Sequence, residues 1–266
     1  MKIIVCVKQV PDTSGKVAVN PDGTLNRASM ATITNPDDLN AVEAALVLKE
    51  QTGAEVVVVC MGPPPAEGML RECLARGCDR AVLVSGREFG GSDTYATSQI
   101  LAAAINKIGV DAEDIVMCGR QAIDGDTAQV GPQIAEKLGL PQISYAADIQ
   151  LDGNTVTVKR MLEDGYMTIK TQTPCLITCI KELNEPRYMS VYGIFDCYSK
   201  PYEVLDYNAL KDDPLIDPST IGLMGSPTNI LTSFTPPQKG AGMMLEGADK
   251  ATCDQLAGIM AAKHMI

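Results

Sequence analysis

Short runs of branched apolar residues alternate along the chain with longer segments in which apolar residues recur at helical spacing. The apolar runs cover residues 2–10, 54–62, 80–86 and 114–119, and the helical segments between them cover residues 35–53, 64–77, 92–109 and 126–139. Strands that are apolar throughout are typical of a parallel sheet buried on both faces, with helices as the crossover connections. The pattern therefore predicts an α/β fold with a doubly wound, mostly parallel sheet.

Residues at the ends of the helical segments support this prediction. Asn35 followed by Pro36 is typical of an N-cap with proline in the first helical turn. Glycines close four helices in turn, at positions 53, 77, 109 and 139. These residues at the helix ends thus agree with the helices that the apolar pattern predicts.

After about residue 147 the pattern changes twice. Residues 148–172 alternate with period two around the turn signals "DGN" and "EDG", which predicts an antiparallel hairpin, and residues 174–179 read as one more buried strand. From about Asn184 the chain is rich in proline and loops until a short final helix near residues 251–263. Because its apolar residues could not form a core alone, we expect this segment to be an extended arm that wraps a partner.

Composition and charge exclude several classes of function. The formal net charge of −11 and the isoelectric point near 4.6 argue against nucleic acid and anionic membranes as partners. Met1 leads through Lys2 directly into the first strand, so we expect no secretory signal and a cytoplasmic location. The nine cysteines form no CxxC pair and the only histidine is His264, so we expect buried free thiols and no metal site.

Ligands of a doubly wound sheet bind beyond the carboxyl ends of the strands, which makes the loops that follow strands informative. The richest of these loops runs from Gly119 to Gly131 into a helix. Asp126 and Gln129 fit a capping pair, and free amides at the helix start would suit a phosphate. A nucleotide whose sugar and base are also recognised would explain the aspartates, whereas the alternative is an ordinary polar loop with an N-cap.

A second loop, "FGGSDTYATS" at Phe89–Ser98, places paired glycines before a helix that Ser92 or Asp93 would cap. It too is suited to an anion. The same letters are similar to the phosphate loop of ATP pyrophosphatases, which normally follows the first strand rather than the third. Two further loops, at residues 35–46 and 60–65, belong to the same rim of the sheet.

Together these stretches resemble the β subunit of electron transfer flavoproteins. The likeness rests on "VKQVPD" at Val7–Asp12, "NPDDLNAVEAAL" at Asn35–Leu46, "GRQAIDGDTAQVG" at Gly119–Gly131 and "NEPRYMS" at Asn184–Ser190. It runs along the whole chain. It implies a Rossmann-like, adenine-nucleotide-binding domain over residues 1–190. Residues 191–266 would then form a recognition loop and a C-terminal arm around the α subunit of a heterodimer.

The resemblance also assigns site residues. Those that would contact an adenosine phosphate are Cys6, Asn35, Pro36, Asp37, Asp38, Cys60, Gly119, Arg120, Gln121, Ala122, Asp124, Gly125, Asp126, Thr127, Gln129, Val130 and Gly131. Those that would carry the pyrophosphate and ribityl chain of a flavin are Gly90, Gly91, Ser92, Asp93, Thr94 and Thr97. No residue is expected to act as a catalytic acid or base, because the flavin carries the chemistry, and Arg120 would tune it.

The central choice is between two kinds of family member. In housekeeping members the β subunit binds only AMP. In electron-bifurcating members of anaerobes it holds a FAD that takes a hydride from NADH; one electron goes to ferredoxin or flavodoxin and the other passes through the α-subunit FAD to an acyl-CoA dehydrogenase. The loop at Gly90–Thr94 resembles the bifurcating members, so we expect FAD and an NADH-oxidising redox subunit.

Val191 matches the apolar anchor of the recognition loop that docks on the dehydrogenase. Here the chain departs from housekeeping members, which carry a run of lysines after the anchor, because it has Asp196, Cys197, Tyr198 and the single Lys200. A different, dedicated dehydrogenase partner is implied. Two alternatives of another class stay open at this point, a stress-protein-like adenine-nucleotide-binding module and an ATP pyrophosphatase-like enzyme.

Overall fold

The computed structural model describes residues 1–12, 31–228 and 240–266, which belong to two compact units. The larger unit comprises Met1–Ala18 and Leu25–Leu231, and the smaller comprises Val19–Thr24 and Thr232–Ile266. In the described part of the smaller unit, helix α8 (Lys250–Ala262) begins after Asp249, whose side chain accepts a hydrogen bond from the amide of Thr252. This confirms the predicted final helix.

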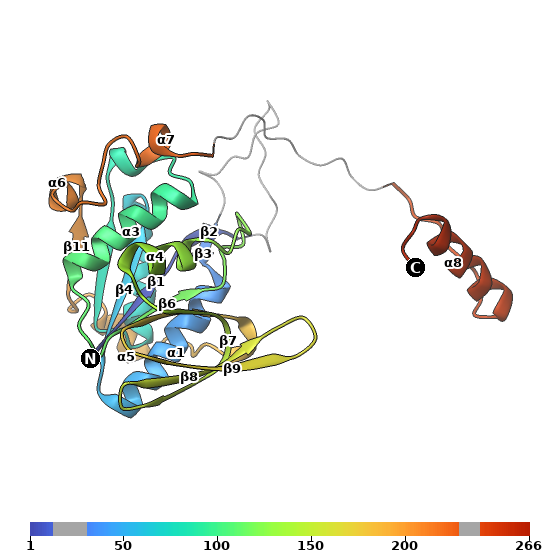
Figure 1. Cartoon of the computed structure of the whole chain (residues 1–266), viewed down its shortest axis with the longest axis horizontal. Helices are drawn as coiled ribbons and strands as arrows, with labels where there is room; N and C mark the ends of the chain where they lie inside the picture. Colours follow the sequence, from blue (N-terminus) through green and yellow to red (C-terminus); the bar gives the residue numbers. More distant parts are fainter. Residues whose placement is uncertain (13–30, 229–239) are drawn as a thin grey trace. The chain divides into compact units, whose positions relative to one another are not determined.

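The larger unit is built on one sheet (Figure 1). Among the described residues nine strands form it, in the order β11-β5-β4-β1-β6-β10-β7-β8-β9. The strands are β1 (Lys2–Cys6), β4 (Glu55–Met61), β5 (Arg80–Val84), β6 (Ile115–Gly119), β7 (Gln142–Asp152), β8 (Thr155–Met161), β9 (Tyr166–Gln172), β10 (Cys175–Cys179) and β11 (Tyr202–Leu205). Neighbours from β11 to β7 run parallel, and β8 and β9 continue antiparallel. The mostly parallel sheet with its hairpin addition is therefore confirmed.

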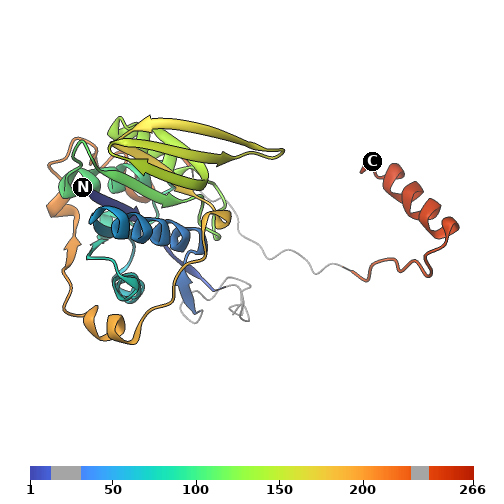
Figure 2. The ribbon, with the colours of Figure 1, turned by 90° about the horizontal axis from the view of Figure 1, so that it is seen from below.

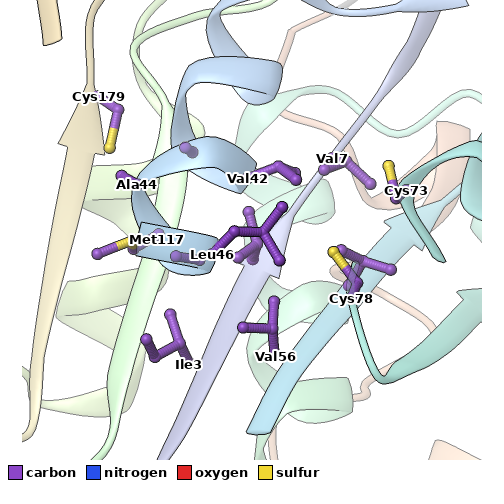
Figure 3. Close-up of a cluster of buried hydrophobic side chains, with 14 of the residues drawn as sticks. Ile3, Val7, Val42, Ala44, Leu46, Val56, Cys73, Cys78, Met117 and Cys179 are labelled. Carbon is purple, nitrogen blue, oxygen red and sulfur yellow. The ribbon is translucent and has the colours of Figure 1, made fainter. Parts of the chain in front are cut away.

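Helices cover both faces of the sheet (Figures 1 and 2). On one face α1 (Pro36–Thr52) and α2 (Glu67–Arg76) form a core with inward residues of the strands, and Figure 3 shows Val42 and Leu46 of α1 beside Ile3, Val56 and Met117. On the other face α3 (Thr94–Ile108) and α4 (Val130–Leu138) pack against the opposite side chains of the same strands. Burial of both faces explains why the strand sequences are apolar throughout.

The helix ends agree with the sequence in most places and differ in two. Gly53 and Gly139 adopt left-handed backbone at the ends of α1 and α4, a conformation that glycine adopts without strain. Pro36 begins α1 as predicted, but the side chain of Asn35 does not cap it. The predicted capping pair of Asp126 and Gln129 is also wrong, because α4 begins only at Val130 and has no side-chain cap. All three side chains, those of Asn35, Asp126 and Gln129, make other contacts in the candidate site.

Several short elements complete the larger unit. They are the strand pair β2 (Gln9–Pro11) and β3 (Thr32–Thr34), the single turns η2 (Pro64–Ala66), η3 (Arg87–Phe89) and η4 (Lys181–Leu183), and the helices α5 (Val191–Asp196), α6 (Tyr207–Leu210) and α7 (Gly222–Gly225). Strand β11 joins the sheet beside β5 although the sequence predicted loops there. The boundary at residue 190 stays a prediction. No described helix has the length and apolar character needed to cross a bilayer.

Candidate functional site

The carboxyl ends of the central strands meet at one edge of the sheet. Cys6, the last residue of β1, is paired with Val59 of β4 on one side and with Cys118 of β6 on the other. The segments that follow these strands and the first turn of α1 therefore converge there, as expected of a doubly wound sheet.

The carboxyl group of Asp38 ties three of these segments together. Asp38 lies in the first turn of α1 and is buried. Its Oδ2 accepts a hydrogen bond from the amide of Lys8 at 2.8 Å, and its Oδ1 accepts one from the amide of Gly119 at 3.0 Å. Burial raises the pKa of the Asp38 carboxyl to about 7, against the opposing effect of its hydrogen bonds. The ends of β1 and β6 are thus fixed to the start of α1.

Gly119 has no room for a side chain because of this contact. A Cβ at Gly119 would lie 2.3 Å from Oδ1 of Asp38 and 2.6 Å from the backbone nitrogen of the same residue. Its backbone can approach α1 only because the side chain is missing. The glycine at the head of the predicted loop is therefore required by packing inside the protein.

Asn35 and Asp37 hold the next residues of the loop. The Nδ2 of Asn35 donates to the carbonyl of Gln121 at 2.8 Å, and its Oδ1 accepts from the amide of Ile123 at 3.1 Å. Arg120 forms an ion pair with Asp37, with 3.2 Å between Nε and Oδ2. Burial raises the pKa of Asp37, and Arg120 opposes this shift. The start of α1 thus fixes the loop by two side chains that sequence reasoning assigned to the ligand.

The middle of the loop is exposed and carries its own contacts. The Nε2 of Gln121 donates to Asp126 at 2.7 Å, and Lys8 forms an ion pair with Asp124 at 2.8 Å. Asp126 and Ala128 have φ of 50° and 53°, a backbone conformation that costs about 1–3 kcal/mol at a non-glycine residue. Such strain persists only where surrounding contacts impose it, and it clusters at ligand-binding sites.

Lys8 lies at the same edge through its contact with Asp124, and the sequence analysis did not assign it to the candidate site, although it lies inside a motif quoted above. Its side chain is about half exposed. An exposed ion pair of this kind stabilises a protein by at most about 1 kcal/mol. Lys8 can therefore exchange Asp124 for an anionic ligand at little cost. A lysine two residues after a strand that ends at this edge was the signal.

The loop ends at the start of α4, whose first turn has no side-chain cap. Gly131 packs so closely that a Cβ would lie 2.8 Å from Cγ2 of Thr178 on β10. The carbonyl of Ala122 accepts hydrogen bonds from the amides of Gly125 and Asp126. Thr127 is exposed and Val130 is half-buried. Among the described residues, no side chain caps the first amides of α4, as an anion site requires.

The two glycine-containing loops lie side by side. The hydroxyl of Thr94, at the start of α3, donates to Oε1 of Gln129 at 2.9 Å. Thr97 lies one turn further along α3 and gives its amide to the carbonyl of Asp93. The structure therefore joins the predicted phosphate loop to the predicted flavin loop.

Ser92 and Asp93 are engaged with a later segment of the chain. Asp93 caps α3 by accepting the amide of Ala96 at 3.0 Å, and its second oxygen accepts the amide of Thr228 at 2.9 Å. Ser92 accepts the amide of Gly222 at 3.1 Å. Gly91 has φ of 75° and lies against Leu223, while Gly90 is exposed. The loop is thus attached to residues 222–228.

The remaining predicted residues line the base of the edge. Cys6 and Cys60 are buried, and Pro36 is exposed at the start of α1. Burial raises the pKa of the Cys60 thiol to about 12, so this thiol is neutral at physiological pH. Thr34, which is also buried, has a hydroxyl without a hydrogen-bond partner among the described residues. Because buried hydroxyls are nearly always bonded, this orphan fits an edge that completes its contacts with a ligand.

A separate apolar surface lies on and around α5. We define the α5 patch as Tyr188, Val191, Tyr192, Phe195 and Tyr198, whose exposed fractions range from 74 to 94%. Lys200, which follows the predicted anchor, donates to the carbonyls of Leu74 and Cys78 at 2.9 Å each. Its ammonium therefore closes the end of α2 and does not extend from the patch.

Comparisons with known proteins identify the family of the chain. A family model described as "Electron transfer flavoprotein domain" matches residues 22–204. The chain is 67% identical to "Acryloyl-CoA reductase electron transfer subunit gamma" of Anaerotignum propionicum, with all of both chains covered. It is 51% identical to "Caffeyl-CoA reductase-Etf complex subunit CarD" of Acetobacterium woodii, covering 99% of this chain and 97% of that one. It is 49% identical to "Electron transfer flavoprotein subunit beta" of Clostridium acetobutylicum over the full length of both.

A methyl group at position 119 should disrupt the edge. We expect Gly119→Ala to lower the free energy of unfolding by about 2–3 kcal/mol, because the added carbon overlaps the Asp38 carboxyl group. Gly125→Ala is the matched control, since nothing lies within 4 Å of a Cβ there. Chemical denaturation of both variants measures the difference; equal stability would contradict the packing described here.

The raised pKa of Asp38 predicts a pH-dependent stability. Between its usual value of 3.8 and about 7 the folded chain binds a proton that the unfolded chain releases. The free energy of unfolding should therefore fall as pH rises through this window, by on the order of 4 kcal/mol, and level off above it. Denaturation curves of wild type and Asp38→Asn across this range test this. A wild-type slope no steeper than that of the variant would show that Asp38 titrates normally.

Proposed function

The chain belongs to the electron transfer flavoprotein family, and from this premise we propose that it is the β-type subunit of a heterodimeric, electron-bifurcating flavoprotein. In this proposal it binds FAD at the carboxyl edge of its sheet and receives a hydride from NADH. Electrons then pass to ferredoxin or flavodoxin and, through the FAD of the α subunit, to an acyl-CoA dehydrogenase. The names of the relatives from A. propionicum and A. woodii support an acyl-CoA reductase as the terminal partner.

The observation that carries the proposal is the contact between Thr94 and Gln129. It joins the first residue of α3, three residues after the glycines at positions 90 and 91, to the residue before α4, although the two contacting residues lie 35 positions apart in the sequence. AMP would need only the loop at Gly119–Gly131. A diphosphate that continues into a flavin needs both loops, together with exposed backbone where side chains would interfere.

The residues of the edge divide into two groups by what they contact. Asn35, Asp37 and Asp38 hold the loop and set its shape. Lys8 and the first amides of α4 would meet phosphate oxygens, and the exposed carboxylates of Asp124 and Asp126 would accept ribose hydroxyls. The aspartates of the loop then serve the sugar and the cation serves the phosphate.

When bound, FAD would supply the hydride acceptor and the one-electron chemistry that no side chain here provides. Arg120 is the cation best placed to affect such a group. Asp37 orients its guanidinium, and its side chain is 42% exposed. A fixed positive charge beside a flavin or its pyrophosphate stabilises their anionic forms.

The alternatives rank below this proposal for different reasons. An AMP-only β subunit remains the nearest rival, because the edge would accept AMP as well. An ATP pyrophosphatase-like enzyme would need the Ser92 and Asp93 side chains at the phosphates, whereas both are bonded to their own chain. A self-contained stress-protein-like module would not need the 27 described residues of the second unit, 240–266.

The α5 patch is the proposed docking surface for the dehydrogenase, with Val191 as its anchor. Exposed aromatic clusters are typical of interface centres. Lysines that could steer a partner electrostatically are missing from the patch, since Lys200 is bonded to the end of α2. Apolar burial would therefore drive the association.

Cofactor content tests the first part of the proposal. The complex co-purified with its α subunit should release two FAD and no AMP, and anaerobic NADH should bleach its visible spectrum. One FAD with one AMP, and a spectrum that NADH leaves unchanged, would establish the AMP-only alternative. Lys8→Gln is expected to weaken retention of the nucleotide at this subunit by about tenfold, because one charge-assisted phosphate contact is lost.

Docking is tested by the dependence of the electron-transfer rate on dehydrogenase concentration. We expect Val191→Asp to raise the KM for the dehydrogenase at least about tenfold with an unchanged nucleotide content. The wild-type KM should change little between about 50 mM and about 500 mM salt, because screening hardly affects apolar contacts. Tyr166→Ser, which alters an aromatic on β9 that is 61% exposed and lies outside the patch, is the control. A steep salt dependence would argue for electrostatic docking instead.

A further inference from the structure

Helix α1 carries buried polar residues that make no contact described above at the carboxyl edge of the sheet. Asn40 and Glu43 lie three residues apart on one side of the helix, and only 4 and 8% of their surfaces are exposed. A buried carboxylate is costly unless it is paired and hydrogen-bonded. The partners of these residues come from a segment more than 140 residues later.

The segment at residues 184–190 satisfies both residues. Asn40 donates from Nδ2 to the carbonyl and the Oδ1 of Asn184, at 2.7 and 3.0 Å, and Asn184 returns a bond to the carbonyl of Asn40 at 3.0 Å. Glu43 accepts from Nε and Nη2 of Arg187 at 2.8 and 2.9 Å and from the amide of Arg187 at 3.0 Å. This is a two-pronged guanidinium–carboxylate pair, the geometry that fixes orientation best.

Arg187 also connects two helices. Its side chain lies on α1, while its carbonyl accepts a hydrogen bond from Nη1 of Arg76 at the end of α2. Tyr188, the first residue of the α5 patch, follows directly. The near end of the patch is therefore held by Arg187.

The far end of the patch is held by α2. A Cβ at Gly193 would lie 2.1 Å from the carbonyl oxygen of Ala75, so α5 sits directly on the end of α2. Arg71 of α2 donates to the carbonyl of Cys197 at 2.9 Å and stacks on Tyr198. Contact with α2 alone would leave the approach to α5 without a fixed point on α1.

We propose that Asn40 and Glu43 are positioning residues that hold the docking surface at a fixed place relative to the nucleotide edge. The first turn of α1 carries Asp37 and Asp38, which shape that edge, and Glu43 follows Asp38 by about 8 Å along the same helix. One rigid helix thus determines where both the cofactor loops and the partner surface lie. The inference rests on the proposed docking role of the α5 patch.

The test breaks the ion pair between Arg187 and Glu43. It separates an effect on docking from an effect on nucleotide binding. In the full heterodimer, Arg187→Met should raise the KM for the dehydrogenase by about tenfold. The kcat at saturating dehydrogenase, the nucleotide content and the reduction by NADH should stay at wild-type values. A purely structural role would lower stability without this separation of KM from kcat.

Two further variants keep the result interpretable. Glu50→Gln removes the other carboxylate on Arg187, which lies 2.6 Å from Nη1 and is 61% exposed, so it should leave KM near the wild-type value. If Arg187→Met does not fold because Glu43 is left buried and unpaired, the double variant Glu43→Gln and Arg187→Met removes both charges and decides the question. The double variant should then show the raised KM.

The outcomes distinguish this inference from the proposed function. A wild-type KM in both Arg187 variants would overturn the positioning role, as would a raised KM accompanied by lost nucleotide. If Val191→Asp also leaves KM unchanged, the α5 patch is not the docking surface and the proposed function fails at that point. If Val191→Asp raises KM and the Arg187 variants do not, only the positioning role fails.

Discussion

The carboxyl group of Asp38 is the contact on which the ligand edge depends. It is buried at the point where β1, β6 and α1 meet, and it accepts the amide of Lys8, just beyond β1, and the amide of Gly119, the last residue of β6. The buried amide of Gly119 would otherwise be unsatisfied, at a cost of about 1–3 kcal/mol. Gly119 is fixed by the same group, because no side chain fits against it. The shape of the loop thus follows from a carboxylate inside the protein.

The sequence determined the fold more clearly than it determined the site, for physical reasons. Periodicity reports burial, and burial of both sheet faces is a property of whole segments, so strands and helices were predicted well. Polar residues are ambiguous because they can bond to a ligand or to the chain. Asn35 resembled a helix cap and instead holds the backbone at residues 121 and 123. Ser92 and Asp93 are bonded to residues 222–228, which no local pattern could reveal.

Sequence analysis missed two features, for different reasons. Strand β11 has only four residues and is half exposed at the edge of the sheet, so neither length nor apolar pattern marks it. Lys8 was visible after the first strand but was not assigned, because a single lysine is usually a solvated surface residue. Its position only becomes informative once the structure places it beside Asp124 and the start of the loop.

The negative charge of the chain affects how an anionic ligand can bind at the ligand edge. The cations nearest the ligand edge, Lys8 and Arg120, are each paired with an aspartate, so an anionic ligand would replace or join a carboxylate rather than enter an open basic pocket. Such exchange favours a ligand that offers hydroxyl and amide groups to the released carboxylate as well as phosphate to the cation. A bare phosphate would pair with the cations, but the aspartates would repel it. A nucleotide would satisfy both, and this selection would arise from the pairing of opposite charges at the edge of the sheet.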